Sequence, residues 1–238
     1  MDVIPPESRR ETRGGGDAPA GPLPLPLRNR LAELILEAFE PGEARATLSA
    51  VAAACGVDGP IPGAADADRL VALGWFEPAG SGRVRLRGAH RAHGRTLGER
   101  AGRAAAVTRQ WRDPDAGEMT VLLDRAAALA NQGLFFEVHE LLEPVWFRAA
   151  EPVRTALQGL IQVAVAFHHL ENRNRQGARS LLVEGVAKVA EAAGALPLDV
   201  AAWLGALRAA LAVLARGDTP ADIPCWPRPA SPAPGRTP

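Results

Sequence analysis

The chain has 238 residues, 47% hydrophobic and 23% charged, which is typical of a folded globular protein of one large or two small domains. Its formal net charge is zero, so bulk charge gives no argument for a nucleic acid or a membrane surface. Cys55 and Cys225 are its only cysteines, which excludes a disulfide framework and a zinc site built from cysteine pairs.

The remaining composition indicates where the protein is found. Lys188 is the only lysine among 27 basic residues, and alanine, glycine and proline are abundant, a usage that indicates a GC-rich bacterial genome. The N-terminal segment does not resemble a signal peptide, and the longest apolar run is too short to span a bilayer. We therefore expect a cytoplasmic protein without membrane contact.

Composition divides the chain into five segments. Residues 1–26 are rich in proline, glycine and charge and predict a disordered lead-in, and residues 218–238 form a proline-rich tail in which Trp226 is a candidate packed anchor. Between them we expect a winged-helix-like module at 27–88, an arginine-rich linker or helix at 89–116 and an all-α bundle at 117–217. The predicted fold class is mainly α, an antiparallel multi-helix bundle preceded by a small α+β module.

The module is predicted from local patterns. Residues 27–39 have a helical apolar stripe, a second helix follows with Thr47 as its N-cap, and a third covers 64–73. Two extended runs around a Gly/Ser turn then predict a β-hairpin that ends near residue 88. Three helices followed by a hairpin is the order of winged-helix domains, which this segment resembles in topology.

Basic residues in and after the hairpin suggest one kind of partner. Residues 83–112 carry a large excess of arginine and could hold the phosphates of a nucleic acid, with contacts predicted at Arg83, Arg85, Arg87, Arg91 and Arg95. The candidate recognition helix, however, carries Asp66 and Asp68, which do not suit base reading. The alternative is a packing or dimerisation module, so a homodimer is left open.

From residue 117 the pattern is helical throughout. We expect helices near residues 117–131, 134–147, 152–171, 175–193 and 199–215. Gly133 is placed to terminate the first of them, and Pro152 suits the first turn of the third. Short connections favour sequential antiparallel packing.

The second of these helices contains HELLE at residues 139–143, which lacks the second histidine of the zinc signature HExxH. A helical wheel places His139 and Glu143 in the middle of the apolar face, and Glu137 and Glu140 at its flank or outside. The next helix carries a polar row among apolar residues, and buried polar groups need partners. We predict an interhelical network in which Glu143 accepts from Arg154 or Gln158 and His139 bonds to Glu143 or a glutamine. The predicted cluster consists of His139, Glu143, Trp146, Arg154, Gln158, Gln162 and His169.

The run GxFFExHExxExxW followed by RxxxQGLIQ is similar to the bacterial and archaeal family described as domain of unknown function 309. The similarity covers about residues 120–185 and rests on Gly133, Phe135, Phe136, Glu137, His139, Glu140, Glu143, Trp146, Arg154, Gln158, Gly159, Leu160, Ile161 and Gln162. It implies a small helical bundle with a cluster around the histidine and glutamates, and no established reaction. Pro144 departs locally from the family pattern.

These features favour an uncharacterised binding or regulatory protein, in which the polar cluster is either structural or part of a ligand-sensing bundle coupled to the winged module. The alternative is a hydrolase-like enzyme that uses a metal or a His–Glu dyad, with His139, Glu140 and Glu143 as catalytic candidates. No cofactor is predicted. A divalent metal at His139 and Glu143 is the weaker alternative, because Arg154 would repel a cation.

Overall fold

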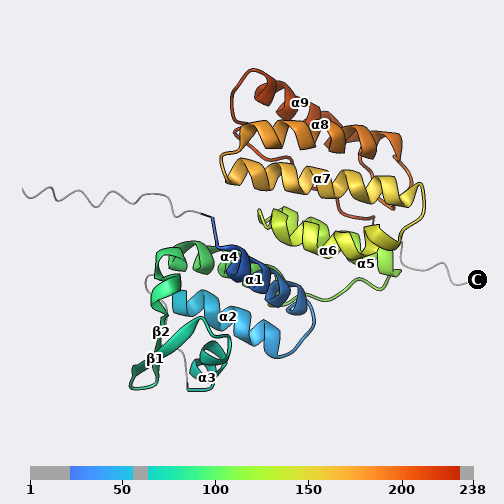
Figure 1. The fold of residues 1–238 in the computed structure, drawn as a ribbon. Helices are drawn as coiled ribbons and strands as arrows, with labels where there is room; N and C mark the ends of the chain where they lie inside the picture. Colours follow the sequence, from blue (N-terminus) through green and yellow to red (C-terminus); the bar gives the residue numbers. More distant parts are fainter. Residues whose placement is uncertain (1–21, 56–63, 231–238) are drawn as a thin grey trace, which may run out of the picture.

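The computed structural model describes residues 22–55 and 64–230. Most of the predicted lead-in lies outside these residues, as does the end of the proline-rich tail. Within the described residues the fold is mainly helical with one small antiparallel sheet, which confirms the predicted fold class (Figure 1). Among them, no helix combines the length and the apolar character needed to cross a bilayer.

The N-terminal half, residues 22–108, has the predicted order of three helices followed by a hairpin. Its first elements are α1 (Leu25–Glu37), α2 (Glu43–Cys55), α3 (Ala64–Ala72), β1 (Phe76–Gly80) and β2 (Arg83–Leu86). The strands pair antiparallel, with Phe76 opposite Leu86, and the hairpin packs on α3. Thr47 is not an N-cap as predicted, because α2 begins one turn earlier and buries this side chain.

The segment after the hairpin is part of the core of this half. It forms a short 3-10 helix, η1 (Gly88–His93), and then α4 (Gly94–Thr108), which packs along α2. Leu97, Ala101 and Ala104 in α4 are fully buried. Arginines stand between these apolar residues in the sequence, so composition alone left residues 89–116 as either a linker or a helix. The structure shows a helix over Gly94–Thr108.

The C-terminal bundle, residues 118–215, has helix boundaries that agree closely with the prediction. It consists of α5 (Glu118–Ala130), α6 (Phe135–Arg148), α7 (Val153–Glu171), α8 (Arg175–Glu191) and α9 (Ala201–Ala215). Gly133 adopts a left-handed φ of 67° in the turn between α5 and α6, a conformation that glycine adopts without steric cost. Helix α6 continues through Pro144 to Arg148, and Pro144 itself is exposed.

The two halves meet along α1 and α4 on one side and α5 and α6 on the other (Figure 1). Their buried apolar residues form one continuous cluster. Arg125 of α5 adds a polar connection, because its guanidinium donates to Glu40 at 2.6 Å and to Asp113 in the loop between the halves. This hydrogen bond with Arg125 lowers the pKa of Asp113. The halves are therefore docked by apolar and charged contacts.

Trp226 is packed, in agreement with its prediction as an anchor. Its side chain is 4% exposed, and its ring centroid lies 5.0 Å from that of Trp203 in α9. Its backbone N–H donates to Oδ1 of Asn131 at 2.7 Å, just after α5. The first part of the tail is thereby fixed across the bundle.

The two cysteines are expected to react at very different rates. Burial raises the pKa of Cys55 to about 12, whereas Cys225 is exposed. Because the thiolate is the reactive form, a disulfide reagent at pH 8 should modify Cys55 on the order of a thousandfold more slowly than an ordinary thiol. Timed labelling of a Cys225→Ser variant, native and in denaturant, measures this directly. Equal rates in the two conditions would contradict it.

Candidate functional site

Helix α6 places one carboxylate in the interior. Glu137 lies in the first turn of α6 and its side chain is completely buried. A negative charge is favoured at a helix N-terminus, but a buried charge also needs a partner. That partner is Arg100 of α4, whose Nη2 donates to Oε2 of Glu137 at 2.6 Å and whose side chain is 9% exposed. The pair therefore joins the two halves in the interior.

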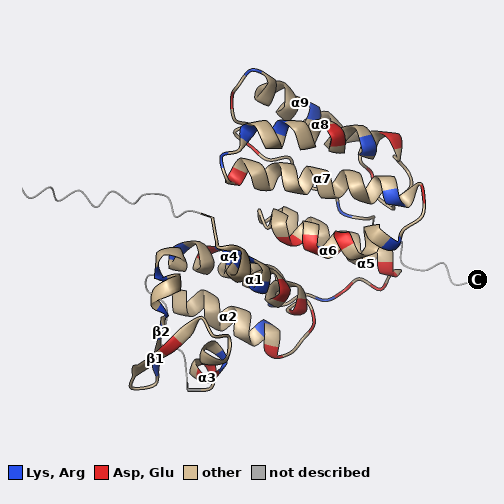
Figure 2. Ribbon diagram, in the orientation of Figure 1, with Lys and Arg blue, Asp and Glu red and all other residues tan. Residues whose placement is uncertain are grey.

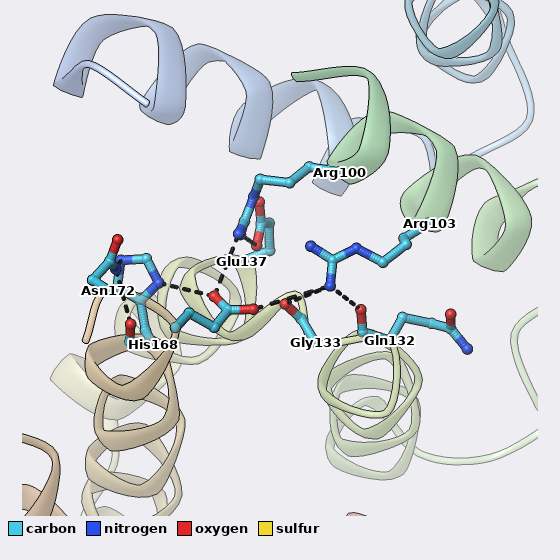
Figure 3. A network of polar contacts seen from close by, with 8 residues as sticks. Arg100, Arg103, Gln132, Gly133, Glu137, His168 and Asn172 are labelled. Carbon is cyan, nitrogen blue, oxygen red and sulfur yellow. Dashed lines mark hydrogen bonds and ion pairs between the residues drawn. The ribbon is translucent and has the colours of Figure 1, made fainter. Parts of the chain in front are cut away.

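The same arginine also reaches α7 (Figure 3). Nη1 of Arg100 donates to Oε2 of Glu171, in the last turn of α7, at 3.5 Å. Burial alone disfavours the charged guanidinium, but attraction to Glu137 and Glu171, together with their hydrogen bonds, raises the pKa of Arg100 above its ordinary value. Arg100 is thus held as a cation between two carboxylates from the C-terminal bundle.

A second arginine of α4 extends this network. Arg103 donates from Nη1 to the carbonyl of Gln132 at 2.9 Å and to that of Gly133 at 3.4 Å, in the turn before α6. The same nitrogen lies 4.0 Å from Oε1 of Glu171, and Nδ1 of His168 lies 3.4 Å from Oε2 of that carboxylate. Charged contacts therefore fix α4 to both α6 and α7.

Beside this network lies a half-open cleft of about 490 Å³ between the two halves. This volume is within the range of small-molecule sites. The N-terminal half contributes the start of α1 and one face of α4, and the bundle contributes the end of α7. The polar residues that line the cleft include Arg28, Thr96, Arg100, Arg103, Glu171 and Arg173.

Several polar atoms in this region lack a partner. The Nε–H groups of Arg28, Arg100 and Arg103, and Oε1 of Glu137, are buried without a hydrogen-bond partner among the described residues. Leaving such a group unsatisfied costs about 1–3 kcal/mol. The guanidinium of Arg28 lies 4.0 Å over the ring of Phe136, which fixes its plane without using its N–H groups. The arginines in the lining make the cleft wall rich in N–H donors, while these particular Nε–H groups lie beneath its surface.

The polar residues of HELLE lie elsewhere, at the surface of α6. Nδ1 of His139 is 3.0 Å from Oε1 of Glu140, and Nε2 is 3.6 Å from Oε1 of Glu143. The predicted contact between His139 and Glu143 thus exists, but the Glu143 side chain is 52% exposed. The prediction that they occupy the middle of the apolar face is wrong, since that face is centred on Val138 and Leu142, which are fully buried.

The predicted interhelical network is also wrong. Among the described residues, no hydrogen bond or ion pair joins Glu143 to Arg154 or Gln158. Arg154 is exposed, and its guanidinium lies 5.4 Å from the ring of Trp146, which is half-buried. These side chains therefore form a surface contact between the end of α6 and the start of α7.

The other members of the predicted cluster have separate partners. Gln162 donates to Oε2 of Glu184 in α8 at 2.7 Å. His169 lies 3.1 Å from Nδ2 of Asn174, and its pKa is lowered by burial and then by the nearby charge of His168. The polar row of α7 is thus divided between α8 and the turn after α7.

The wrong prediction that His139 and Glu143 lie in the middle of the apolar face has a physical cause. Phe135, Phe136 and Trp146 pull the centre of a helical wheel towards His139, although Trp146 lies at the edge of the core. The flank that carries Glu137 is covered by α1 and α4 of the other half, which a wheel of one helix cannot include. Two features of the sequence are consistent with a buried Glu137 and an arginine partner. Glu137 stands within an apolar run of the family motif, and the segment before the bundle carries excess arginine.

The arginines predicted to contact nucleic acid have intramolecular partners in several cases. Arg85 donates to Glu77 at 2.8 Å, and Arg87 donates to the carbonyl of Phe76 at 3.3 Å. Glu77 also lies 3.7 Å from Arg91, and Arg95 donates to Glu99 at 3.0 Å, whereas Arg83 is exposed on β2. Acidic and basic residues are mixed in this half (Figure 2). Nucleic-acid binding stays a prediction.

Metal ligation was the weaker alternative for His139 and Glu143. Among the described residues, no group of three or more His, Cys, Asp or Glu side chains is placed to hold a metal ion. His139 has only Glu140 and Glu143 as acidic neighbours, and neither residue lines the cleft.

Fold and site together define a mainly helical protein of two halves with a charged cleft between them. Residues 123–181 match the family described as Domain of unknown function (DUF309), which confirms the resemblance predicted from the two motifs. The matched residues lie within the C-terminal bundle. It supplies Glu137, His168 and Glu171, while Arg100 and Arg103 lie outside the matched residues. No curated protein and no solved structure matched the chain.

Proposed function

We propose that this protein is a regulatory protein that binds a small ligand in the cleft between its two halves. The observation that carries the proposal is the cleft itself, about 490 Å³ in volume, with the guanidinium groups of Arg28, Arg100, Arg103 and Arg173 in its lining. Ligand sites are commonly concave, lie at domain interfaces and have a few convergent polar groups.

The position of the cleft supports a regulatory role. A ligand there touches α4 from one side and the end of α7 from the other, next to the Arg100 contacts with Glu137 and Glu171. A ligand changes an equilibrium only through its different affinity for the two states. This ligand contacts both halves only when they are docked, so its binding stabilises the docked arrangement. The N-terminal half then carries the regulatory output.

The proposal is tested by blocking the cleft. Thr96 lines it, is half-buried and makes no side-chain hydrogen bond to any residue that the structure describes, so a Thr96→Trp variant fills the space without breaking such an interaction. Thr120→Trp on α5 is the matched control, because Thr120 has the same exposure class and lies outside the cleft. Both variants and the wild type are screened against small metabolites by thermal unfolding.

A ligand present at about a hundred times its Kd is expected to raise the Tm of the wild type and of Thr120→Trp by about 5–10 °C. The same ligand should leave the Tm of Thr96→Trp unchanged. An equal shift in all three proteins would place the ligand outside the cleft, and a screen without any hit would end the proposal.

A further inference from the structure

We propose that the ligand of the cleft is a small phosphate monoester, a dianion held by arginine forks; this inference rests on the proposed function. Its first support is the charge balance at the lining. Four guanidinium groups line the cleft, from Arg28, Arg100, Arg103 and Arg173.

Two of these arginines, Arg28 and Arg173, form no ion pair with an acidic residue in the described part of the chain. Glu137 and Glu171 contact Arg100, and Glu171 also contacts Arg103. Glu99 lines the cleft as well, but it pairs with Arg95 at 3.0 Å. Two positive charges thus have no carboxylate partner among the described residues. A ligand with two negative charges matches this surplus.

The second support is the kind of donor. Arginine presents its N–H groups in a planar fork that suits phosphate oxygens, and such charge-assisted hydrogen bonds are stronger than neutral ones. The side chain of Arg100 lines the cleft, is only 9% exposed and is held by Glu137 and Glu171, so its fork keeps one orientation.

The third support is the backbone of Arg173. It follows Asn172, the C-cap of α7, and has a left-handed φ of 58°, at a position where glycine is usual. A residue other than glycine in this conformation is strained, and such strain is found at functional sites. Arg173 brings a positive charge to the lining of the cleft, whereas a glycine at this position would bring none.

The shape of the cleft indicates an organic part in addition to the phosphate. Arginines occupy the walls formed by α1, α4 and the end of α7, while Pro22 and Leu23 add an apolar surface at the same cleft. A volume of about 490 Å³ exceeds the needs of a bare oxyanion. The phosphate therefore lies against the guanidinium groups, and the remainder of the ligand extends along Pro22 and Leu23.

Calorimetric titration with glycerol 3-phosphate tests this, with glycerol, malonate and spermidine as neutral, dicarboxylate and cationic probes at one ionic strength. Glycerol 3-phosphate should bind the wild type, and Arg28→Gln should weaken its binding about 10- to 100-fold. Arg173→Gly should weaken it similarly while raising the Tm of the free protein, because glycine relieves the strained φ. Arg179→Gln on α8 is the control, since Arg179 is exposed and lies outside the cleft.

The outcomes separate this inference from the proposed function. Binding of malonate, glycerol or spermidine that Thr96→Trp abolishes, without binding of glycerol 3-phosphate, would overturn the phosphate assignment and keep the ligand cleft. Phosphate binding that is equal in Arg28→Gln, Arg173→Gly and Arg179→Gln would show adventitious ion binding and overturn the assignment. If none of the four probes binds, the phosphate assignment falls, and the metabolite screen alone then decides whether the cleft binds a ligand.

Discussion

Replacement of Gly159 by alanine is expected to destabilise the protein by about 1–3 kcal/mol, because a Cβ there has no room. Helices α7 and α8 cross where Gly159 faces Gly185. A Cβ added at Gly159 would lie 2.8 Å from the backbone nitrogen of Val189 and 3.0 Å from the carbonyl oxygen of Gly185. Backbone atoms of a packed helix cannot move aside as a flexible side chain does. The two helices would therefore have to separate.

Chemical and thermal unfolding followed by circular dichroism measure this loss, which corresponds to a fall in Tm of about 2–4 °C per kcal/mol. Gly205→Ala in α9 is the matched control, since a Cβ at Gly205 meets nothing within 4 Å. That variant should be stabilised by up to about 1 kcal/mol through the higher helix propensity of alanine. Shifts of the same sign and size at Gly159 and Gly205 would contradict the close crossing.

Replacement of Glu137 by leucine is expected to cost about 3–5 kcal/mol, because it leaves the buried Arg100 without its nearest counter-charge. Glu137 accepts from Arg100 at 2.6 Å, whereas the remaining partner, Glu171, lies at 3.5 Å. The same replacement at Glu143, which is half-exposed at the surface of α6, should change stability by less than about 0.5 kcal/mol. Urea unfolding of both variants measures the contrast.

The double variant Glu137→Leu/Arg100→Met completes a thermodynamic cycle. It removes both charges and puts apolar side chains of similar volume in their place, so it should be more stable than Glu137→Leu alone. A cycle in which the two losses simply add would show that Arg100 and Glu137 do not interact in solution. A large loss at Glu143 instead would restore the network predicted around HELLE.

Local order along the chain was predictable because it depends on neighbouring residues. The apolar spacing of α5 to α9, the left-handed glycine at 133 and the hairpin near residue 80 are all local signals. The motifs likewise identified the family over residues 123–181. Each of these features is determined by residues within a few turns of one another.

The burial of charge was not predictable in this way. Glu137 and Arg100 are 37 positions apart, and Glu171 is 71 positions from Arg100. Whether a polar residue at the flank of a helix is exposed depends on what covers it, and here α4 covers Glu137 while Glu143 and Arg154 stay uncovered. The prediction left residues 89–116 open between a linker and a helix, and it did not place Arg100 against α6.

The sequence by itself therefore determined the helices, the hairpin, the division into two differently patterned halves and the family of the second. Only the tertiary structure decided which glutamate is buried, which arginines pair with it and where a cleft remains. The physical reason is that secondary structure follows from local periodicity, whereas burial and charge pairing depend on surfaces that distant segments bring together. The polar residues of HELLE lie at the surface of α6. Glu137, two positions before this motif, carries the buried charge.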